Sequence, residues 1–241
     1  MVIKVEIIAF ANQKGGVAKT TSTYNIAVLK AMAGKRVLMI DLDPQSSLTI
    51  LCNFMPGKTD SIDCGYLVKT TGLKNLYIVP SDIELAEVEQ NITGRTAREK
   101  ILKKALKSFE EYFDYIFIDC PPQLGILTTN ALVAADKVIT PAKAEYLSYR
   151  GIRSLKRTIQ NVREENLNEK LSFEGFIITM FEKNINDQRD ILEHFKKEAP
   201  ILGIVKKSAD TYRNILDGIP VVMSNPKSNV AHSYKEIAER I

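Results

Sequence analysis

The residues best suited to chemistry form one run near the N-terminus, Lys14-Gly15-Gly16-Val17-Ala18-Lys19-Thr20-Thr21. Small residues let a backbone wrap around an anion, so that several amide N–H groups point at it. A lysine placed like Lys19 reaches the β- and γ-phosphates of a nucleotide, and the Thr20 hydroxyl is suited to bind Mg²⁺ directly. The alternative is a tight turn with solvated lysines. The two glycines, the Lys-Thr-Thr ending and the position between a strand and a helix favour a loop that binds ATP and Mg²⁺.

Carboxylates follow two further apolar runs. Val37–Ile40 leads into Asp41-Leu42-Asp43-Pro44-Gln45, and Tyr115–Ile118 leads into Asp119-Cys120-Pro121-Pro122. Ligands bind at the carboxyl ends of the strands in open α/β sheets, and Mg²⁺ is held by few carboxylates together with water and phosphate oxygens. An aspartate after a strand also serves as a helix cap or turn former. Two such ends in the same sheet as the phosphate loop favour the functional interpretation.

Apolar runs and amphipathic segments alternate along the chain. We expect strands at residues 3–10, 37–40, 76–79, 115–118, 137–140 and 173–180, and helices at 20–33, 95–109, 124–135, 147–165, 187–198 and 230–241. This alternation predicts right-handed crossovers and a parallel sheet covered on both faces. The sequence therefore predicts one α/β domain over residues 1–241, built on a doubly wound, mostly parallel sheet.

Composition excludes several classes of protein. The 241 residues are 45% hydrophobic and 26% charged with a net charge of +4, which is ordinary for a globular protein and excludes disordered and fibrous chains. No apolar run approaches the roughly 20 residues of a membrane-spanning helix. Three cysteines, Cys52, Cys64 and Cys120, are too few for a disulfide framework. The absence of a signal-type start favours a cytoplasmic location.

The loop departs from the standard GxxxxGK[ST] pattern, because Gln13 stands at the first glycine position, Ala18 at the second, and Lys14 is additional. It resembles the KGGxxK[ST]T motif of the deviant Walker-A ATPases, which include the ParA and MinD families and the nitrogenase iron protein. The resemblance implies a P-loop NTPase fold, Mg²⁺-dependent hydrolysis of ATP to ADP and phosphate, and a homodimer formed with ATP. It also implies that Lys14 crosses the dimer interface to the nucleotide of the other subunit.

The segments DLDPQ and DCPP are similar to the second and third nucleotide motifs of the ParA family. By this resemblance Asp43 orients the attacking water and is catalytic together with Lys14. Asp41 supports the hydration shell of Mg²⁺, and Asp119 holds Mg²⁺ through water. Ala18 replaces the usual glycine, and its methyl group crowds a loop that approaches phosphate closely.

Basic residues gather in three sets: residues 95–107, residues 143–157, and a C-terminal set with interleaved acids. Each set also fits a solvated helix face. ParA-family dimers bind double-stranded DNA without sequence preference through basic residues of the C-terminal half, by neutralising phosphates. The candidates for this contact are Lys183, Arg189, Lys206, Lys207 and Arg213.

The resemblance implies a DNA-partition ATPase of plasmids or chromosomes, associated with the nucleoid and stimulated by a centromere-binding ParB-type partner. The first strand begins at residue 3, which fits the short type without an N-terminal DNA-binding extension. The alternative is a MinD-like membrane-cycling ATPase. Residues 230–241 have few large apolar side chains and no strong basic face, so no membrane partner is expected. A nitrogenase-type cluster needs two bridging cysteines, and the three present are better explained as small buried or surface thiols.

Overall fold

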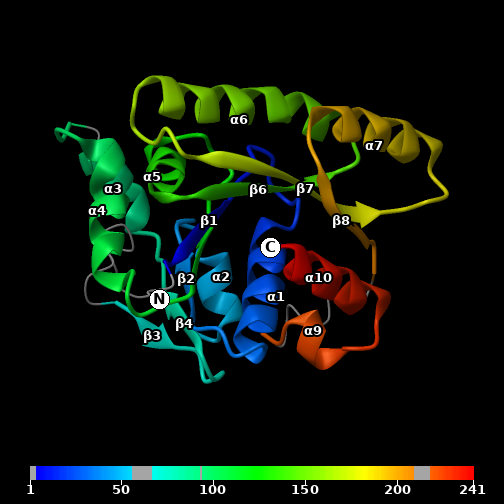
Figure 1. Ribbon diagram of the computed structural model, residues 1–241, viewed down its shortest axis with the longest axis horizontal. Coiled ribbons are helices and arrows are strands. Elements are labelled where there is room, and N and C mark those ends of the chain that lie inside the picture. The colour runs from blue at the N-terminus through cyan, green and yellow to red at the C-terminus, as the bar shows by residue number, and fades with distance from the viewer. Residues whose placement is uncertain (1–3, 56–66, 93, 209–217) are drawn as a thin grey trace.

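A computed structural model describes residues 4–55, 67–92, 94–208 and 218–241. Its described strands form one eight-stranded sheet in the order β3-β4-β2-β5-β1-β6-β7-β8 (Figure 1). Every neighbouring pair is parallel except β3 with β4. The strands are β1 (Glu6–Phe10), β2 (Val37–Asp41), β3 (Lys69–Thr70), β4 (Leu76–Val79), β5 (Tyr115–Asp119), β6 (Lys137–Lys143), β7 (Ser172–Phe181) and β8 (Ile201–Lys206).

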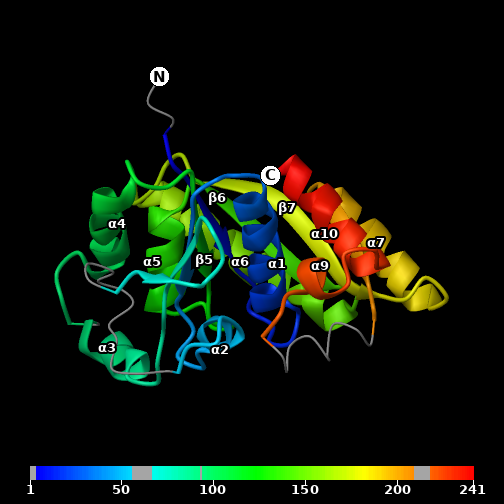
Figure 2. The same ribbon diagram turned by 90° about the horizontal axis from the view of Figure 1, so that it is seen from below.

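Helices cover both faces of the sheet, as the alternation of elements predicts (Figures 1 and 2). One face carries α3 (Leu85–Ile92), α4 (Ile101–Leu106), α5 (Ile126–Ala134), α6 (Tyr146–Glu164) and α7 (Asn186–Glu198). The other carries α1 (Lys19–Met32), α2 (Ser47–Leu51), α9 (Val221–Ser224) and α10 (Asn229–Arg240). Figures 1 and 2 both show α1 and α10 side by side.

The central strands are buried on both sides, so their side chains supply two separate cores. In β1, Ile7 and Ala9 pack toward α5, whereas Ile8 and Phe10 pack toward α1 and α10. This period-2 alternation within an almost wholly apolar run is typical of a central parallel strand. The two cores fix the sheet rigidly between its helical layers, and the loops at its carboxyl edge inherit that rigidity.

The predicted elements agree with the structure except in one segment and at some boundaries, but the sequence did not predict α2, β3, α3, β8 or α9. The single basic helix expected over residues 95–109 is wrong. This segment contains the short helix α4 between the 3-10 turns η1 (Arg98–Lys100) and η2 (Lys107–Phe109). Ala97 adopts a left-handed conformation with φ 54°, which an α-helix does not continue through. Strand β6 also extends through Pro141 to Lys143, three residues beyond the predicted end.

Candidate functional site

The loop between β1 and α1 has the backbone shape of an anion-binding turn. Gly16 and Ala18 both take left-handed conformations, with φ 67° and 63°, and α1 begins at Lys19. Left-handed residues within such a turn let successive N–H groups converge on one point. Val17 between them is buried, and its carbonyl accepts a hydrogen bond of 3.0 Å from the Thr179 hydroxyl of β7. This hydrogen bond fixes the loop to strand β7 of the sheet.

Lys19 places a positive charge inside this turn. Its side chain is almost completely buried, and its Nζ donates a long hydrogen bond of 3.4 Å to the carbonyl of Lys14 at the opposite end of the loop. In the part of the chain that the structure describes, no carboxylate forms an ion pair with Lys19. A buried ammonium in a turn of this shape suits a bound anion.

The buried carboxylate of Asp119 lies at the end of β5. The register aligns Asp119 with Asp41 at the end of β2 and with Phe10 at the end of β1. No hydrogen bond of good geometry reaches either Asp119 oxygen among the described residues, although the Thr20 hydroxyl is near enough to act on the carboxylate. Burial raises the pKa of Asp119 to about 8 and the charge of Asp41 adds to this, while the Thr20 hydroxyl and the Lys19 ammonium act in the opposite direction. A buried, unsatisfied carboxylate facing a phosphate loop fits a hydrated Mg²⁺ ion.

Asp41 is equally buried, but it is well satisfied by its own segment. Its Oδ2 accepts hydrogen bonds from the backbone N–H of Thr49 at 2.9 Å and from the Thr49 hydroxyl at 2.8 Å. Its Oδ1 accepts one from the N–H of Asp43 at 3.1 Å. Burial nevertheless raises the pKa of Asp41 to about 6. Asp41 thus fixes α2 and the backbone of Asp43, and its predicted support of the Mg²⁺ hydration shell stays a prediction.

Asp43 lies in a turn that is held at several points. Its Oδ1 accepts the N–H of Gln45 at 3.0 Å, and its carbonyl accepts the N–H of Ser46 at 2.8 Å and the Ser81 hydroxyl at 2.9 Å. Ser81 follows β4, so the turn is bound to the next strand of the sheet. These contacts orient Asp43 at the same sheet edge as the loop.

Lys14 does not point at its own loop. Its ammonium forms an ion pair with Glu145, the residue immediately before α6. The two residues are 131 positions apart, and nothing in the sequence singled out Glu145. The structure thus gives Lys14 a partner within its own subunit.

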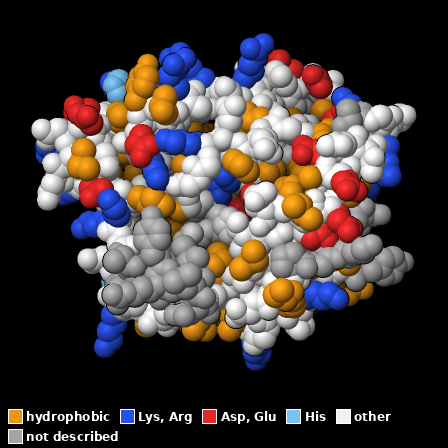
Figure 3. All heavy atoms as spheres, turned by 180° about the vertical axis from the view of Figure 1, so that it is seen from behind, with side chains coloured by type: hydrophobic (Ala, Val, Ile, Leu, Met, Phe, Trp, Pro, Cys, Tyr) orange, Lys and Arg blue, Asp and Glu red, His pale blue; other side chains and the backbone are white. Residues whose placement is uncertain are grey.

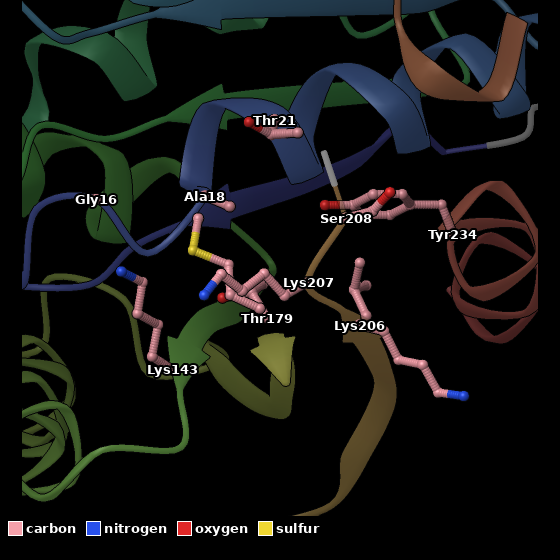
Figure 4. Close-up of a pocket in the computed structure, with 11 residues that line it drawn as sticks. Gly16, Ala18, Thr21, Lys143, Thr179, Lys206, Lys207, Ser208 and Tyr234 are labelled. Carbon is pink, nitrogen blue, oxygen red and sulfur yellow. The ribbon is translucent and has the colours of Figure 1, made fainter. Parts of the chain in front are cut away.

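A cavity of about 390 Å³ opens beside the loop (Figure 4). Gly16, Ala18 and Thr21 line one side of it, and the segment Lys206–Ser208 with Met180 lines another. In Figure 4 the Lys206 side chain runs away from the loop, so its ammonium is directed outward. The cavity is within the size range of small-molecule sites in proteins.

Of the predicted DNA contacts, Lys206 and Lys207 line this cavity. Lys183 and Arg189 are exposed at the start of the α7 region, and Lys207 forms an ion pair of 3.0 Å with Glu182. Lys206 and Lys207 also line a second cavity, of about 390 Å³, together with Lys227. Arg213 and Cys64 lie outside the described residues, and the free thiols of Cys52 and Cys120 are buried. The sequence did not single out Lys227, because it is an isolated basic residue in a polar turn.

Comparison with known proteins identifies the family. A family profile described as an AAA domain matches residues 5–173. The sporulation initiation inhibitor protein Soj of Bacillus subtilis is 34% identical over 250 residues, which cover 98% of this chain and 98% of Soj. The chromosome partitioning protein ParA of Myxococcus xanthus is 35% identical over 98% of this chain and 87% of its own length. The chain belongs to the ParA family of ATPases.

A solved structure with a bound nucleotide analog is similar to this ParA-family chain. Cobyrinic acid a,c-diamide synthase of Mycobacterium smegmatis, solved with a bound ATP analog and magnesium, is 32% identical with a TM-score of 0.82. The match covers 98% of this chain and 93% of the synthase. The doubly wound P-loop NTPase fold expected from the sequence is thereby confirmed.

The backbone at Ala18 gives a first prediction for this ParA-family protein. A left-handed alanine costs about 1–2 kcal/mol, and glycine regains part of this while losing about 0.4–1 kcal/mol through its freer unfolded chain. We expect Ala18→Gly to raise the free energy of unfolding by up to about 1 kcal/mol, measured by urea titration without nucleotide. Ala105→Gly in α4 is the matched control and should destabilise by about 1 kcal/mol. Equal destabilisation by both variants would contradict the strain at Ala18.

Asp119 gives a second prediction, on pH. Burial raises the pKa of Asp119 from its ordinary value of 3.8 to about 8, so the folded state binds one more proton than the unfolded chain between these pH values. The stability of the nucleotide-free protein should therefore fall as pH rises from 5 to above 8. Asp41, with a pKa of about 6, acts in the same direction. Asp119→Asn should flatten this fall in urea titrations at several pH values, and the exposed Glu193→Gln should not. If the free energy of unfolding of Asp119→Asn falls with pH as steeply as that of the unaltered protein, the raised pKa of Asp119 is refuted.

Proposed function

We propose that the protein binds ATP with Mg²⁺ at the loop of residues 14–21 and hydrolyses the bond between the β- and γ-phosphates. The buried Lys19 and the converging amides would hold the phosphates. The Thr20 hydroxyl would ligate Mg²⁺ directly, with Asp119 and Asp41 acting through water. When bound, the ion neutralises charge on the phosphate oxygens. The cavity beside the loop has room for the base and ribose.

Asp43 and Lys14 are the proposed catalytic residues. The turn around Asp43 is fixed by Asp41 and Ser81, which supports a role in orienting a water molecule. The loop already contains Lys19, and Lys14 is directed to Glu145 instead of into the loop. This arrangement supports a role for Lys14 outside its own nucleotide site, at the site of a second subunit in a homodimer.

The cellular role that we infer is partition of plasmid or chromosomal DNA. The observation that carries it is the match with the chromosome partitioning protein ParA of Myxococcus xanthus, 35% identical over 98% of this chain. In this proposal two ATP-bound subunits pair, bind nucleoid DNA without sequence preference, and leave it when a centromere-binding ParB-type partner stimulates hydrolysis. On the face shown in Figure 3, basic side chains are spread among acidic and apolar ones. Such a surface supports weak DNA binding by one subunit and a need for pairing.

Residues 206–208 lie between the proposed sites for ATP and for DNA. Lys206, Lys207 and Ser208 line both the cavity beside the loop and the second cavity, where Lys227 precedes the N-terminus of α10. The N-terminus of a helix favours anions, and three lysines line the cavity beside it, of which Lys207 also pairs with Glu182. We therefore add Lys227 to Lys183, Arg189, Lys206, Lys207 and Arg213 as candidates for DNA phosphate contacts.

Packing of the last helix argues against the MinD-like alternative. The apolar residues of α10, among them Val230, Tyr234 and Ile237, are buried in the core against α1 and β8. A helix that binds a lipid surface needs its apolar face free. No helix within the described ranges combines the length and the apolar character needed to cross a bilayer.

The two lysines of the loop should behave differently. Lys19→Ala removes the buried charge inside the turn, so one subunit should lose most of its affinity for a fluorescent ATP analogue. Lys14→Ala should keep most of that affinity, because its ammonium lies on Glu145, but should no longer pair on ATP. Equilibrium titration measures the affinity and sedimentation velocity measures pairing. Equal loss of affinity in both variants would place Lys14 in its own site.

DNA binding should depend on nucleotide and salt. Pairing doubles the number of phosphate contacts, and the logarithm of affinity scales with that number. We expect ATP, but not ADP, to switch on binding to random-sequence duplexes in fluorescence anisotropy. Lys227→Glu should weaken that binding and reduce the salt slope by about 1 per lost contact, without altering ATP affinity. Lys104→Glu on α4 is the charge-matched control and should bind normally. An ATP-bound dimer that ignores DNA and sediments with anionic liposomes would replace partition by the MinD-like role.

A further inference from the structure

Lys14 is tied to the segment between β6 and α6 at two levels. Its ammonium contacts Glu145, and its backbone N–H donates a hydrogen bond of 2.9 Å to Asn12 Oδ1. The Asn12 side chain in turn donates a hydrogen bond of 2.8 Å to the carbonyl of Pro141 in β6. The start of the loop and the end of β6 therefore form one connected unit.

Glu145 is itself held in place by its backbone. Its N–H donates to the carbonyl of Lys143 at 2.8 Å, and its carbonyl accepts the N–H of Tyr149 in the first turn of α6. The next two residues, Tyr146 and Leu147, are 63% and 67% exposed despite their apolar side chains. The Lys14–Glu145 pair thus lies next to two exposed apolar side chains at the start of α6.

We propose that Glu145 is a positioning residue that holds the Lys14 ammonium on its own subunit until two ATP-bound subunits pair. On pairing, the ammonium leaves Glu145 for phosphate oxygens of the partner's nucleotide. This inference rests on the proposed cross-subunit role of Lys14. In this inference Glu145 opposes pairing, because it competes with the partner's nucleotide for the Lys14 ammonium.

Competition for one ammonium sets the size of the effect. The Lys14 and Glu145 side chains are 29% and 45% exposed, so solvent weakens their attraction. A pair this exposed shifts an equilibrium by at most about fivefold. Each dimer must break two such pairs, so releasing both should favour pairing by up to about 25-fold.

Glu145→Gln tests the effect on pairing. The amide keeps the size of the side chain but removes the charge that competes for Lys14. With AMPPNP and Mg²⁺, sedimentation velocity should give a dimer dissociation constant between about 2-fold and 25-fold lower than that of the unaltered protein. Glu193→Gln is the matched control, because it breaks an exposed ion pair with Lys196 on α7 and changes the net charge equally. Its dissociation constant should equal that of the unaltered protein.

A second readout examines the ion pair without nucleotide. An amine-reactive reagent followed by mass spectrometry measures the labelling rate of Lys14, which should rise several-fold in Glu145→Gln and stay unchanged in Glu193→Gln. Thermal melting of each variant confirms that it is folded. The shorter carboxylate of Glu145→Asp should give an intermediate labelling rate and an intermediate dissociation constant.

The possible results separate the two hypotheses. Unchanged labelling of Lys14 in Glu145→Gln overturns the inference, and so does faster labelling with unchanged or weaker pairing. If Lys14→Ala pairs as tightly as the unaltered protein, the proposed cross-subunit role fails, while the labelling rates still report whether Glu145 holds Lys14. Faster labelling together with tighter pairing supports Glu145 as the positioning residue.

Discussion

Electrostatic compensation at one edge of the sheet is the constraint on which the rest of the structure depends. The parallel register of β2, β5 and β1 brings Asp41, Asp119 and the start of the phosphate loop to the same level. Asp41 is satisfied there by Thr49 and Asp43, whereas no hydrogen bond of good geometry reaches Asp119 among the described residues. A buried carboxylate without a partner is costly, and a cation that arrives with a phosphate ligand would compensate it, as we propose for Mg²⁺ with ATP.

Contacts from neighbouring strands hold the candidate site residues in place. Thr179 fixes the loop from β7, Ser81 fixes the turn of Asp43, and Glu145 holds Lys14 at the start of α6. Each contact comes from a different strand end, so the loop, the turn and the first turn of α6 are positioned by one rigid sheet. The same sheet end continues through Lys206–Ser208 to the basic cavity beside α10. Nucleotide and DNA would thus meet on adjoining surfaces of one scaffold.

The sequence predicted the parts of this arrangement that depend on local pattern. Six of the eight described strands, most of the longer helices and the aspartates at strand ends follow from apolar runs and turn chemistry, whereas the short α2, β3 and α9, and also α3 and β8, were not predicted. The register between Asp41 and Asp119, the satisfaction of Asp41 by Thr49 and the pairing of Lys14 with Glu145 depend on contacts between distant segments, which no local pattern encodes. The broken helix over residues 95–109 shows the same limit, because amphipathic spacing does not reveal the left-handed backbone at Ala97.

A mixing experiment tests the central claim, that a complete nucleotide site is shared by two subunits. Lys14→Ala keeps its own phosphate loop and Asp43, and Asp43→Ala keeps Lys14 and its own phosphate loop, so it binds ATP, but it lacks the carboxylate that orients the attacking water. If Lys14 acts across the interface, a mixed pair contains one complete site, and the mixture should hydrolyse ATP several-fold faster than the sum of the two proteins measured separately. Hydrolysis no faster than that sum, with mixed pairs demonstrated by sedimentation of differently labelled subunits, would contradict the account.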